Sequence, residues 1–315
     1  MESYYAKGKL LLTGEYLVME GSRALATPLN RGQHLRVFPQ MAASGTLHWV
    51  GYDADGNVWL DIRLRVGSWE PFEHSLEAGR LCLLLREASR ANPFFVEQCD
   101  GVRVETQLTF PRCWGWGSSS TLVSLISQWS GADAFGLQFL VFGGSGYDVA
   151  CATAPSAILY EKAGGVGEGI RVCPVTYCPP FVEQLYLVYL GKKQDTRDSI
   201  AAFRKNRLDV DATSRLSERI SQITDELLAC YTLSGAAGLL AEHEALLSAR
   251  LGCMPVRRQF FSDFLGGVGF VKSLGAWGGD FVWVGSEEKP EVVRRYFREK
   301  GFDTVLSYRS CVDLG

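Results

Sequence analysis

A segment rich in glycine and serine, Pro111–Ser120, constrains the fold of this chain most strongly, because a predicted strand ends there and a predicted helix begins. In this glycine–serine loop, Gly115 and Gly117 permit a tight backbone path that turns successive N–H groups toward one point. Ser118–Ser120 open the helix, whose positive dipole end faces the same point. Such a turn binds an anion, for example a nucleotide phosphate, or it merely caps the helix with serine. The loop alone leaves both interpretations open.

Length and composition indicate a globular protein with two cores. A chain of 315 residues is long for one core, so we expect two domains. Hydrophobic residues make up 47% and charged residues 21%, which are ordinary values for a globular protein. The net charge of −3 argues against a nucleic-acid partner, because nucleic-acid binders normally carry a basic face.

The N-terminus, the longest uncharged run, the cysteines and the histidines indicate which compartment, membrane contact and metal sites to expect. The first residues lack the apolar core of a signal peptide, so we expect a cytoplasmic protein. The uncharged run 113–132 contains many serines and glycines, so we expect no membrane partner. Nine cysteines without framework spacing are typical of reduced thiols, and four isolated histidines argue against a structural metal site.

The first half of the chain has the pattern of an antiparallel sheet followed by a helix. Short β-like runs separated by turn residues predict a mostly antiparallel sheet from Lys9–Thr13, Gln33–Phe38, Gly45–Val50 and Asn57–Val66. Helical spacing then appears over Ser75–Ser89, and alternation returns over Val102–Phe110, before the glycine–serine loop.

The second half has the pattern of a split βαββαβ arrangement. The proline-rich stretch Cys173–Pro180 is a linker candidate, and it predicts an N-terminal domain at 1–178 and a C-terminal domain at 179–315. The predicted elements are then, in order, Gln184–Leu190 (strand), Thr196–Arg207, Asp211–Tyr231 and Ala236–Leu251 (helices), Gly269–Ser273 and Phe281–Gly285 (strands), a helix from Pro290, and Thr304–Tyr308 (strand).

Two further glycine-rich turns invite a functional interpretation. Phe142–Asp148 precedes a run of small residues, and Asp148 either caps the following helix or directs its carboxylate into a cleft. Leu274–Asp280 lies between paired strands and is richer in glycine than a hairpin requires. It is either a flexible hairpin or backbone packed close to a ligand.

Three segments in order resemble the signature motifs of the GHMP kinases, a superfamily that includes galactokinase, homoserine kinase and mevalonate kinase. These segments are Ala6–Tyr16, Pro111–Ser120 and Ser273–Gly279. Phe142–Ala150 resembles the branch named for a Gly-Tyr-Asp-Ile-Ala motif, with Val149 in place of isoleucine. The resemblance implies an α+β fold with a ribosomal-protein-S5-like N-terminal domain, a ferredoxin-like C-terminal domain and ATP in the cleft between them.

The resemblance also implies a reaction, the transfer of the γ-phosphoryl group of ATP to the alcohol of a small-molecule substrate. Asp148 matches the catalytic aspartate, and Lys9 matches the lysine beside it. The loop residues Gly115, Trp116, Gly117, Ser118, Ser119 and Ser120 match the phosphate-binding motif, and Ser119 is the candidate ligand of Mg²⁺. The substrate pocket is assigned to Glu15, Tyr16 and Thr196, with support from Gly275, Gly278 and Gly279.

Substrate choice rests on the first motif, Gly14–Gly21, which is closer to mevalonate and phosphomevalonate kinases than to galactokinases. Mevalonate, and hence isoprenoid biosynthesis, is the first expectation, and phosphomevalonate is the second. The motifs also leave open diphosphomevalonate decarboxylation and nucleotide binding without catalysis. A homodimer is also considered, because aromatic residues such as Tyr4, Trp59 and Trp69 suit a dimer face as well as a core.

Departures from the family pattern concern the metal and the aromatic residues. Mevalonate and homoserine kinases carry a Mg²⁺-binding glutamate about three helical turns before the catalytic aspartate, where this chain has Leu137 and Gln138. Asp133 is the nearest acidic residue upstream. Trp116 and Trp277 replace smaller residues of the motifs, and they either stack on adenine or narrow the cleft.

Overall fold

The computed structural model describes residues 1–39, 41–73, 75–162, 169–191, 209–264, 268–275, 277 and 280–314. The chain packs into two compact units whose segments alternate along the sequence. The first unit comprises Met1–Lys9, Arg31–Arg112 and Trp116–Thr153, and the second comprises Leu10–Asn30, Cys113–Gly115 and Ala154–Gly315. The glycine–serine loop therefore contributes residues to both units. The predicted boundary at residue 178 stays a prediction.

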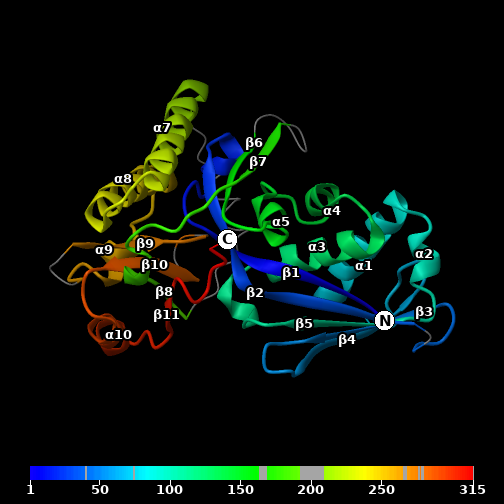
Figure 1. The fold of residues 1–315 in the computed structure, drawn as a ribbon. Coiled ribbons are helices and arrows are strands. Elements are labelled where there is room, and N and C mark those ends of the chain that lie inside the picture. The colour runs from blue at the N-terminus through cyan, green and yellow to red at the C-terminus, as the bar shows by residue number, and fades with distance from the viewer. Residues whose placement is uncertain are drawn as a thin grey trace. The chain divides into compact units, whose positions relative to one another are not determined.

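The first unit has a sheet with helices on one of its faces (Figure 1). Strand order is β4-β3-β5-β2, with β1 paired to β2. β3 and β5 are parallel, whereas β3 with β4 and β2 with β5 are antiparallel, which confirms the mostly antiparallel sheet. The strands are β1 (Glu2–Leu11), β2 (Ala24–Phe38), β3 (Thr46–Tyr52), β4 (Val58–Arg65) and β5 (Arg103–Leu108), and β1 and β2 each extend into the second unit.

The helices of the first unit cover the sheet with their apolar faces. Helix α1 is capped at Ser75, whose hydroxyl accepts a hydrogen bond from the Ala78 N–H at 3.0 Å. Its buried residues Leu81, Leu84 and Leu85 lie on one face, as helical spacing predicts. The helices are α1 (Leu76–Ala91), α2 (Phe95–Gln98), α3 (Ser118–Ser130), α4 (Ala134–Val141) and α5 (Tyr147–Ala152). Trp69, which was considered for a dimer face, is buried in this core together with Trp49.

The second unit contains the predicted split βαββαβ arrangement. Its antiparallel sheet has the strand order β11-β8-β10-β9, which confirms the ferredoxin-like topology. These strands are β8 (Leu185–Tyr189), β9 (Gly269–Ser273), β10 (Phe281–Ser286) and β11 (Val305–Ser307). The helices are α7 (Val210–Leu228), α8 (Leu233–Leu251), α9 (Val256–Phe260) and α10 (Pro290–Glu299). The short 3₁₀ turns are η1 (Leu17–Glu20), η2 (Arg112–Trp114) and η3 (Val182–Gln184), and of η2 only Cys113 and Trp114 belong to this unit.

Sequence patterns missed two strands of the second unit. Strands β6 (Ile158–Lys162) and β7 (Ile170–Pro174) pair antiparallel, and β6 also pairs with the first residues of β2. β7 includes Cys173 and Pro174 of the predicted linker, and proline is tolerated there because β7 is the last strand of the sheet among the described residues. The predicted helix Thr196–Arg207 lies outside the described residues. Among the described helices, none is both long and apolar enough to cross a membrane.

Candidate active site

Lys9 and Asp148 come together in the first unit. Lys9 lies on β1, and Asp148 lies in the first turn of α5, after the left-handed residue Gly146. The Lys9 Nζ atom is 3.5 Å from Oδ1 of Asp148. That Oδ1 atom is buried, yet it accepts no hydrogen bond from the described residues. A buried carboxylate oxygen beside a cation, with its own acceptor capacity unused, is suited to receive a proton.

The glycine–serine loop contacts both the backbone and the side chain of Lys9. The Lys9 N–H donates to the Trp116 carbonyl at 3.0 Å, so β1 is fixed to the loop. Gly117 has a φ of 92°, and a β-carbon there would lie 3.2 Å from both Cγ and Cε of Lys9. A side chain at this position would be strained by the positive φ and would push against the lysine side chain, so glycine is favoured here. The positive φ values of Gly115 and Gly117 confirm the tight backbone path that the sequence predicts.

The three serines of the loop differ in burial, and one of them stabilises the turn. Ser120 is buried, and its hydroxyl donates to the Gly117 carbonyl at 2.9 Å, which stabilises the turn. Ser118 begins α3 and is half-buried, whereas Ser119 is exposed on the first turn of the helix. Ser119 is therefore the serine of this turn most open to an anion or a hydrated cation. Its assignment to Mg²⁺ stays a prediction.

The two motif tryptophans are core residues. Trp116 is 1% exposed, and its ring centroid lies 5.9 Å from that of Phe110 within the first unit. Trp277 is 7% exposed and packs with Ile220 and Leu247 of the second unit. Buried rings cannot stack on adenine in this conformation, so the stacking interpretation is not supported. Trp116 contributes to the loop through its carbonyl.

Helix α4 carries the residues that stand where a metal-binding glutamate was expected. Asp133 caps this helix and accepts a hydrogen bond from the Gly136 N–H at 2.6 Å. Gln138 is buried, and its Nε2 atom donates to the Gly143 carbonyl at 2.9 Å. The Oε1 atom of Gln138 is buried and accepts no hydrogen bond from the described part of the chain. A neutral amide thus occupies the position of the expected acid.

In the second unit, the start of the loop packs against the third glycine-rich turn. A β-carbon on Gly115 would lie 2.2 Å from Oδ2 of Asp280, so any other residue would displace this carboxylate. The Trp114 ring lies 5.4 Å from that of Phe281, and the Tyr189 hydroxyl donates to the Cys113 carbonyl at 3.2 Å. Gly275 has a φ of 62°, with the same Asp280 oxygen 3.8 Å from its β-carbon position. Gly278 and Gly279 lie outside the described residues.

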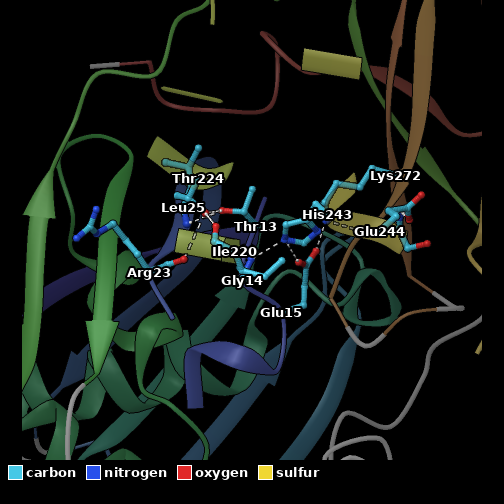
Figure 2. A network of polar contacts seen from close by, with 11 residues as sticks. Thr13, Gly14, Glu15, Arg23, Leu25, Ile220, Thr224, His243, Glu244 and Lys272 are labelled. Atoms are coloured by element: carbon cyan, nitrogen blue, oxygen red, sulfur yellow. Dashed lines mark hydrogen bonds and ion pairs between the residues drawn. The ribbon is translucent and has the colours of Figure 1, made fainter. Parts of the chain in front are cut away.

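Glu15, which was assigned to the substrate pocket, is buried in a polar network of the second unit (Figure 2). Its Oε1 atom accepts a hydrogen bond from the Lys272 ammonium, which is itself fully buried on β9. Burial raises the pKa of Glu15 to about 7, although the charge of Lys272 opposes this shift. The ammonium also donates to the Ser273 carbonyl at 2.9 Å. Substrate contact by Glu15 stays a prediction.

Helix α8 completes the network with two further buried residues. The Gly14 N–H donates to Nε2 of His243 at 3.0 Å, so this nitrogen carries no proton. Burial and the charge of Lys272 lower the pKa of His243 well below its usual value, and the ring is neutral. Its Nε2 atom, 3.5 Å from Oε2 of Glu15, therefore makes no ion pair. Glu244 accepts a hydrogen bond from the Ser273 N–H at 2.7 Å, and burial raises its pKa.

Of the other assigned substrate residues, Tyr16 has a φ of 62° and is 7% exposed among apolar residues of the second unit. Thr196 lies outside the described residues. A surface hollow of about 260 Å³ on the first unit includes none of the assigned residues and is lined by His34, Arg36, Tyr52, Gly56, Glu105 and Gln107.

Comparison with known proteins shows similarity at the level of structure. No protein-family model matches the chain, and no curated protein matches it. Phosphomevalonate kinase of Streptococcus pneumoniae, in complex with phosphomevalonate and AMPPNP, matches 98% of this chain and 99% of its own, with a TM-score of 0.71 and 16% identity. The match to galactokinase of Lactococcus lactis, complexed with galactose, covers 96% of this chain and 92% of the galactokinase chain, with a TM-score of 0.70 and 12% identity. The match to mevalonate kinase of Methanococcus jannaschii covers 97% of this chain and 96% of the mevalonate kinase chain, with a TM-score of 0.66 and 14% identity. The chain has the GHMP kinase fold.

On this GHMP kinase fold, the structure adds residues that sequence motifs did not single out. Tyr147 lies beside the assigned Asp148, and its hydroxyl accepts a hydrogen bond from Lys9 at 3.0 Å. Lys272 is the one charged residue of the buried strand β9, a signal that could have indicated a buried ion pair. Asp280 gave no sequence signal, because its contact with Gly115 depends on the fold.

Proposed function

We propose that this protein is an ATP-dependent kinase that transfers the γ-phosphoryl group to the alcohol of a small molecule. The observation that carries the proposal is the Lys9–Asp148 pair, held against the left-handed turn at Gly117. The AMPPNP complex of the S. pneumoniae enzyme supports ATP as the co-substrate. Positioned charges of this kind account for most of the catalysis in phosphoryl transfer.

The roles of the residues follow from the geometry of the first unit. The substrate oxygen bonds to the γ-phosphorus, the bond to the β–γ bridging oxygen breaks, and ADP leaves. Oδ1 of Asp148 takes the hydroxyl proton, because it is buried and accepts no hydrogen bond from the described residues. The Lys9 ammonium stabilises negative charge on the transferred group. The N-terminus of α3, with Ser119 exposed on it, binds phosphate oxygens.

Mg²⁺ fits this protein best as an ion that is bound mainly by the nucleotide. Within the described ranges, no cluster of three or more acidic, histidine or cysteine residues could hold a metal. Mg²⁺ commonly binds through substrate phosphates, water and one or two protein oxygens. The Ser119 hydroxyl is the protein ligand that we propose. The ion would neutralise charge on the phosphates when it is bound.

Mevalonate is the substrate that we propose first, and phosphomevalonate is the second. The first motif, Gly14–Gly21, supports this order, because it is closer to mevalonate and phosphomevalonate kinases than to galactokinases. The structural comparisons do not choose among substrates, since galactokinase and phosphomevalonate kinase match with TM-scores of 0.70 and 0.71.

A second candidate function is nucleotide binding without phosphoryl transfer. It is favoured by α4, where Gln138 supplies an amide in place of an acid and Asp133 is used as a helix cap. ATP binding measured by calorimetry, without ADP release from any alcohol, would support this candidate over the kinase.

The experiment that tests the kinase is ADP release from Mg-ATP by the purified protein, with mevalonate, phosphomevalonate, diphosphomevalonate, homoserine and galactose as separate substrates. The Asp148→Asn variant serves as the control in each reaction. ADP release that depends on one alcohol and disappears in the variant supports the kinase and identifies its substrate. Carbon dioxide released together with ADP identifies a decarboxylase instead.

A further inference from the structure

The Tyr147 hydroxyl lies closer to the Lys9 ammonium than the Asp148 carboxylate does. The Lys9 Nζ atom donates to the Tyr147 hydroxyl at 3.0 Å, whereas its distance to Oδ1 of Asp148 is 3.5 Å. The same ammonium lies 5.3 Å from the centroid of the Tyr147 ring, within range of a cation–π interaction. All three residues belong to the first unit.

The phenol of Tyr147 stays neutral in this environment. Burial raises the pKa of Tyr147 above its usual value, and the charge of Asp148 and a hydrogen bond to it raise the pKa further. The charge of Lys9 and its hydrogen bond act in the opposite direction. A neutral hydroxyl uses a lone pair to accept from the ammonium, and its own hydrogen remains available for the carboxylate. The hydroxyl is therefore placed to bridge the two charged groups.

The bridge fixes a side chain that otherwise has several rotamers. Lysine has a flexible four-carbon stem, and a hydrogen bond from its charged group contributes more than one between neutral groups. The stem lies along Gly117, and the ammonium is directed to Tyr147 at the start of α5. Contacts at both ends of the stem determine where the cation lies.

We propose that Tyr147 is a positioning residue for phosphoryl transfer, whose hydroxyl holds the Lys9 ammonium beside the Asp148 carboxylate. The proposal rests on the kinase function proposed above. Tyr147 would then differ from an ordinary core tyrosine, because removal of its hydroxyl alone should impair catalysis while the ring and the fold remain.

The test is the Tyr147→Phe variant, with Tyr231→Phe as the matched control, since Tyr231 is 78% exposed and lies in the second unit. Two measurements are made, steady-state kinetics with the substrate found in the panel and ¹H–¹⁵N spectra of lysine ammonium groups. The Lys9 signal is assigned by its loss in Lys9→Met. Thermal unfolding of both variants shows that the fold is retained.

We expect Tyr147→Phe to lower kcat by roughly 10- to 100-fold, the range given by loss of a hydrogen bond to a charged group. The KM for ATP should stay within about two-fold of the wild type, because a residue that acts only in the transition state leaves ground-state binding unchanged. The slowly exchanging Lys9 ammonium signal should disappear. Tyr231→Phe should change none of these values.

A wild-type kcat in Tyr147→Phe would overturn the proposal. If the wild-type protein phosphorylates no alcohol in the panel, the proposed function fails, and the Lys9 signal alone then decides the role of Tyr147. A signal that persists in Tyr147→Phe would show that the hydroxyl does not hold the ammonium, and its loss would support the bridge without the kinase.

Discussion

The Lys9 ammonium lies 3.5 Å from Oδ1 of Asp148, a buried carboxylate oxygen that accepts no hydrogen bond from the described residues. These two residues are 139 positions apart in a 315-residue chain, and the first unit brings them together from β1 and α5. Burial of one charge beside another is favourable only when each compensates the other, so the pair behaves as one functional group.

Asp148→Asn should abolish turnover and leave ATP binding within about two-fold of the wild type. The amide keeps the shape of the carboxylate, but it cannot accept the substrate proton, and loss of such a base lowers rates by about 10² to 10⁴. ADP release and calorimetric titration with ATP measure the two effects. Full activity in the variant would exclude Asp148 as the base.

Lys9→Met should lower kcat by about 10² or more, because it removes the positive charge beside Asp148 while the stem along Gly117 remains. Stability should change less than for a fully buried ion pair, because the Asp148 side chain is 30% exposed to solvent and methionine fills a volume similar to that of lysine. Kinetics and chemical unfolding distinguish the two effects. An unchanged kcat would make Lys9 only a structural partner of Asp148.

Gly117→Ala should reduce turnover through the position of Lys9. The new β-carbon would lie 2.7 Å from the Ser120 hydroxyl and 3.2 Å from two carbons of Lys9, and the φ of 92° is strained for alanine. Gly131→Ala is the matched control, because Gly131 has a φ of 73° and no described atom within 4 Å of its β-carbon position. Each variant should lose about 1–2 kcal/mol of unfolding free energy from backbone strain.

The two glycine variants should lose similar stability from strain but differ in kcat. Gly117→Ala should lose at least about ten-fold in kcat, whereas Gly131→Ala should retain the wild-type value, because its strain lies at the far end of α3. Equal losses of kcat in both variants would show that strain alone, and not the contact with Lys9, controls activity.

The sequence predicted the elements whose patterns are local. Strand β9 matches the prediction Gly269–Ser273 at both ends, and α10 begins at Pro290 as expected, since proline favours the first helical turn. The first half of β1 was missed, because its inward residues Ala6 and Gly8 are small and have low β propensity. Their burial depends on pairing with β2, which sequence spacing does not show.

The candidate site was predictable to the extent that motifs identify single residues. Lys9 and Asp148 were matched to motif positions before their contact was known. The sequence could not show that Trp116 faces Phe110 in the core, or that Gly115 packs on Asp280, because both contacts join residues through the tertiary fold. Tyr147 was visible in the motif, but only the distance to Lys9 gives it a role.

Lys272→Met should destabilise the protein strongly, because it leaves Glu15 buried without its cation. Breaking a buried ion pair by removing one partner costs about 3–5 kcal/mol. The double variant Glu15→Gln/Lys272→Met should recover part of this loss, since no uncompensated charge remains. Urea unfolding of both proteins measures the difference. A double variant less stable than Lys272→Met alone would contradict this account of the pair.

The pH dependence of stability should reveal opposing contributions from Glu15 and His243. In the folded state the pKa of Glu15 is raised to about 7 from 4.5, so between these values the folded protein binds more protons there than the unfolded chain. The contribution of Glu15 to unfolding free energy therefore decreases as pH rises from about 4.5 to 7. The pKa of His243 is lowered well below 6.5, so its contribution decreases as pH falls below 6.5.

Glu15→Gln removes the contribution of Glu15 to the pH dependence of stability and leaves that of His243. The variant should lose stability more steeply than the wild type as pH is lowered from 6.5 to 5, with a difference in slope that approaches about 1.4 kcal/mol per pH unit, the effect of one proton. Unfolding free energies from urea titrations at several pH values measure both slopes. Glu218→Gln, on the exposed face of α7, is the control for loss of a carboxylate. Parallel curves for Glu15→Gln and the wild type would mean that Glu15 remains charged in the folded protein and that Lys272 fully offsets its burial.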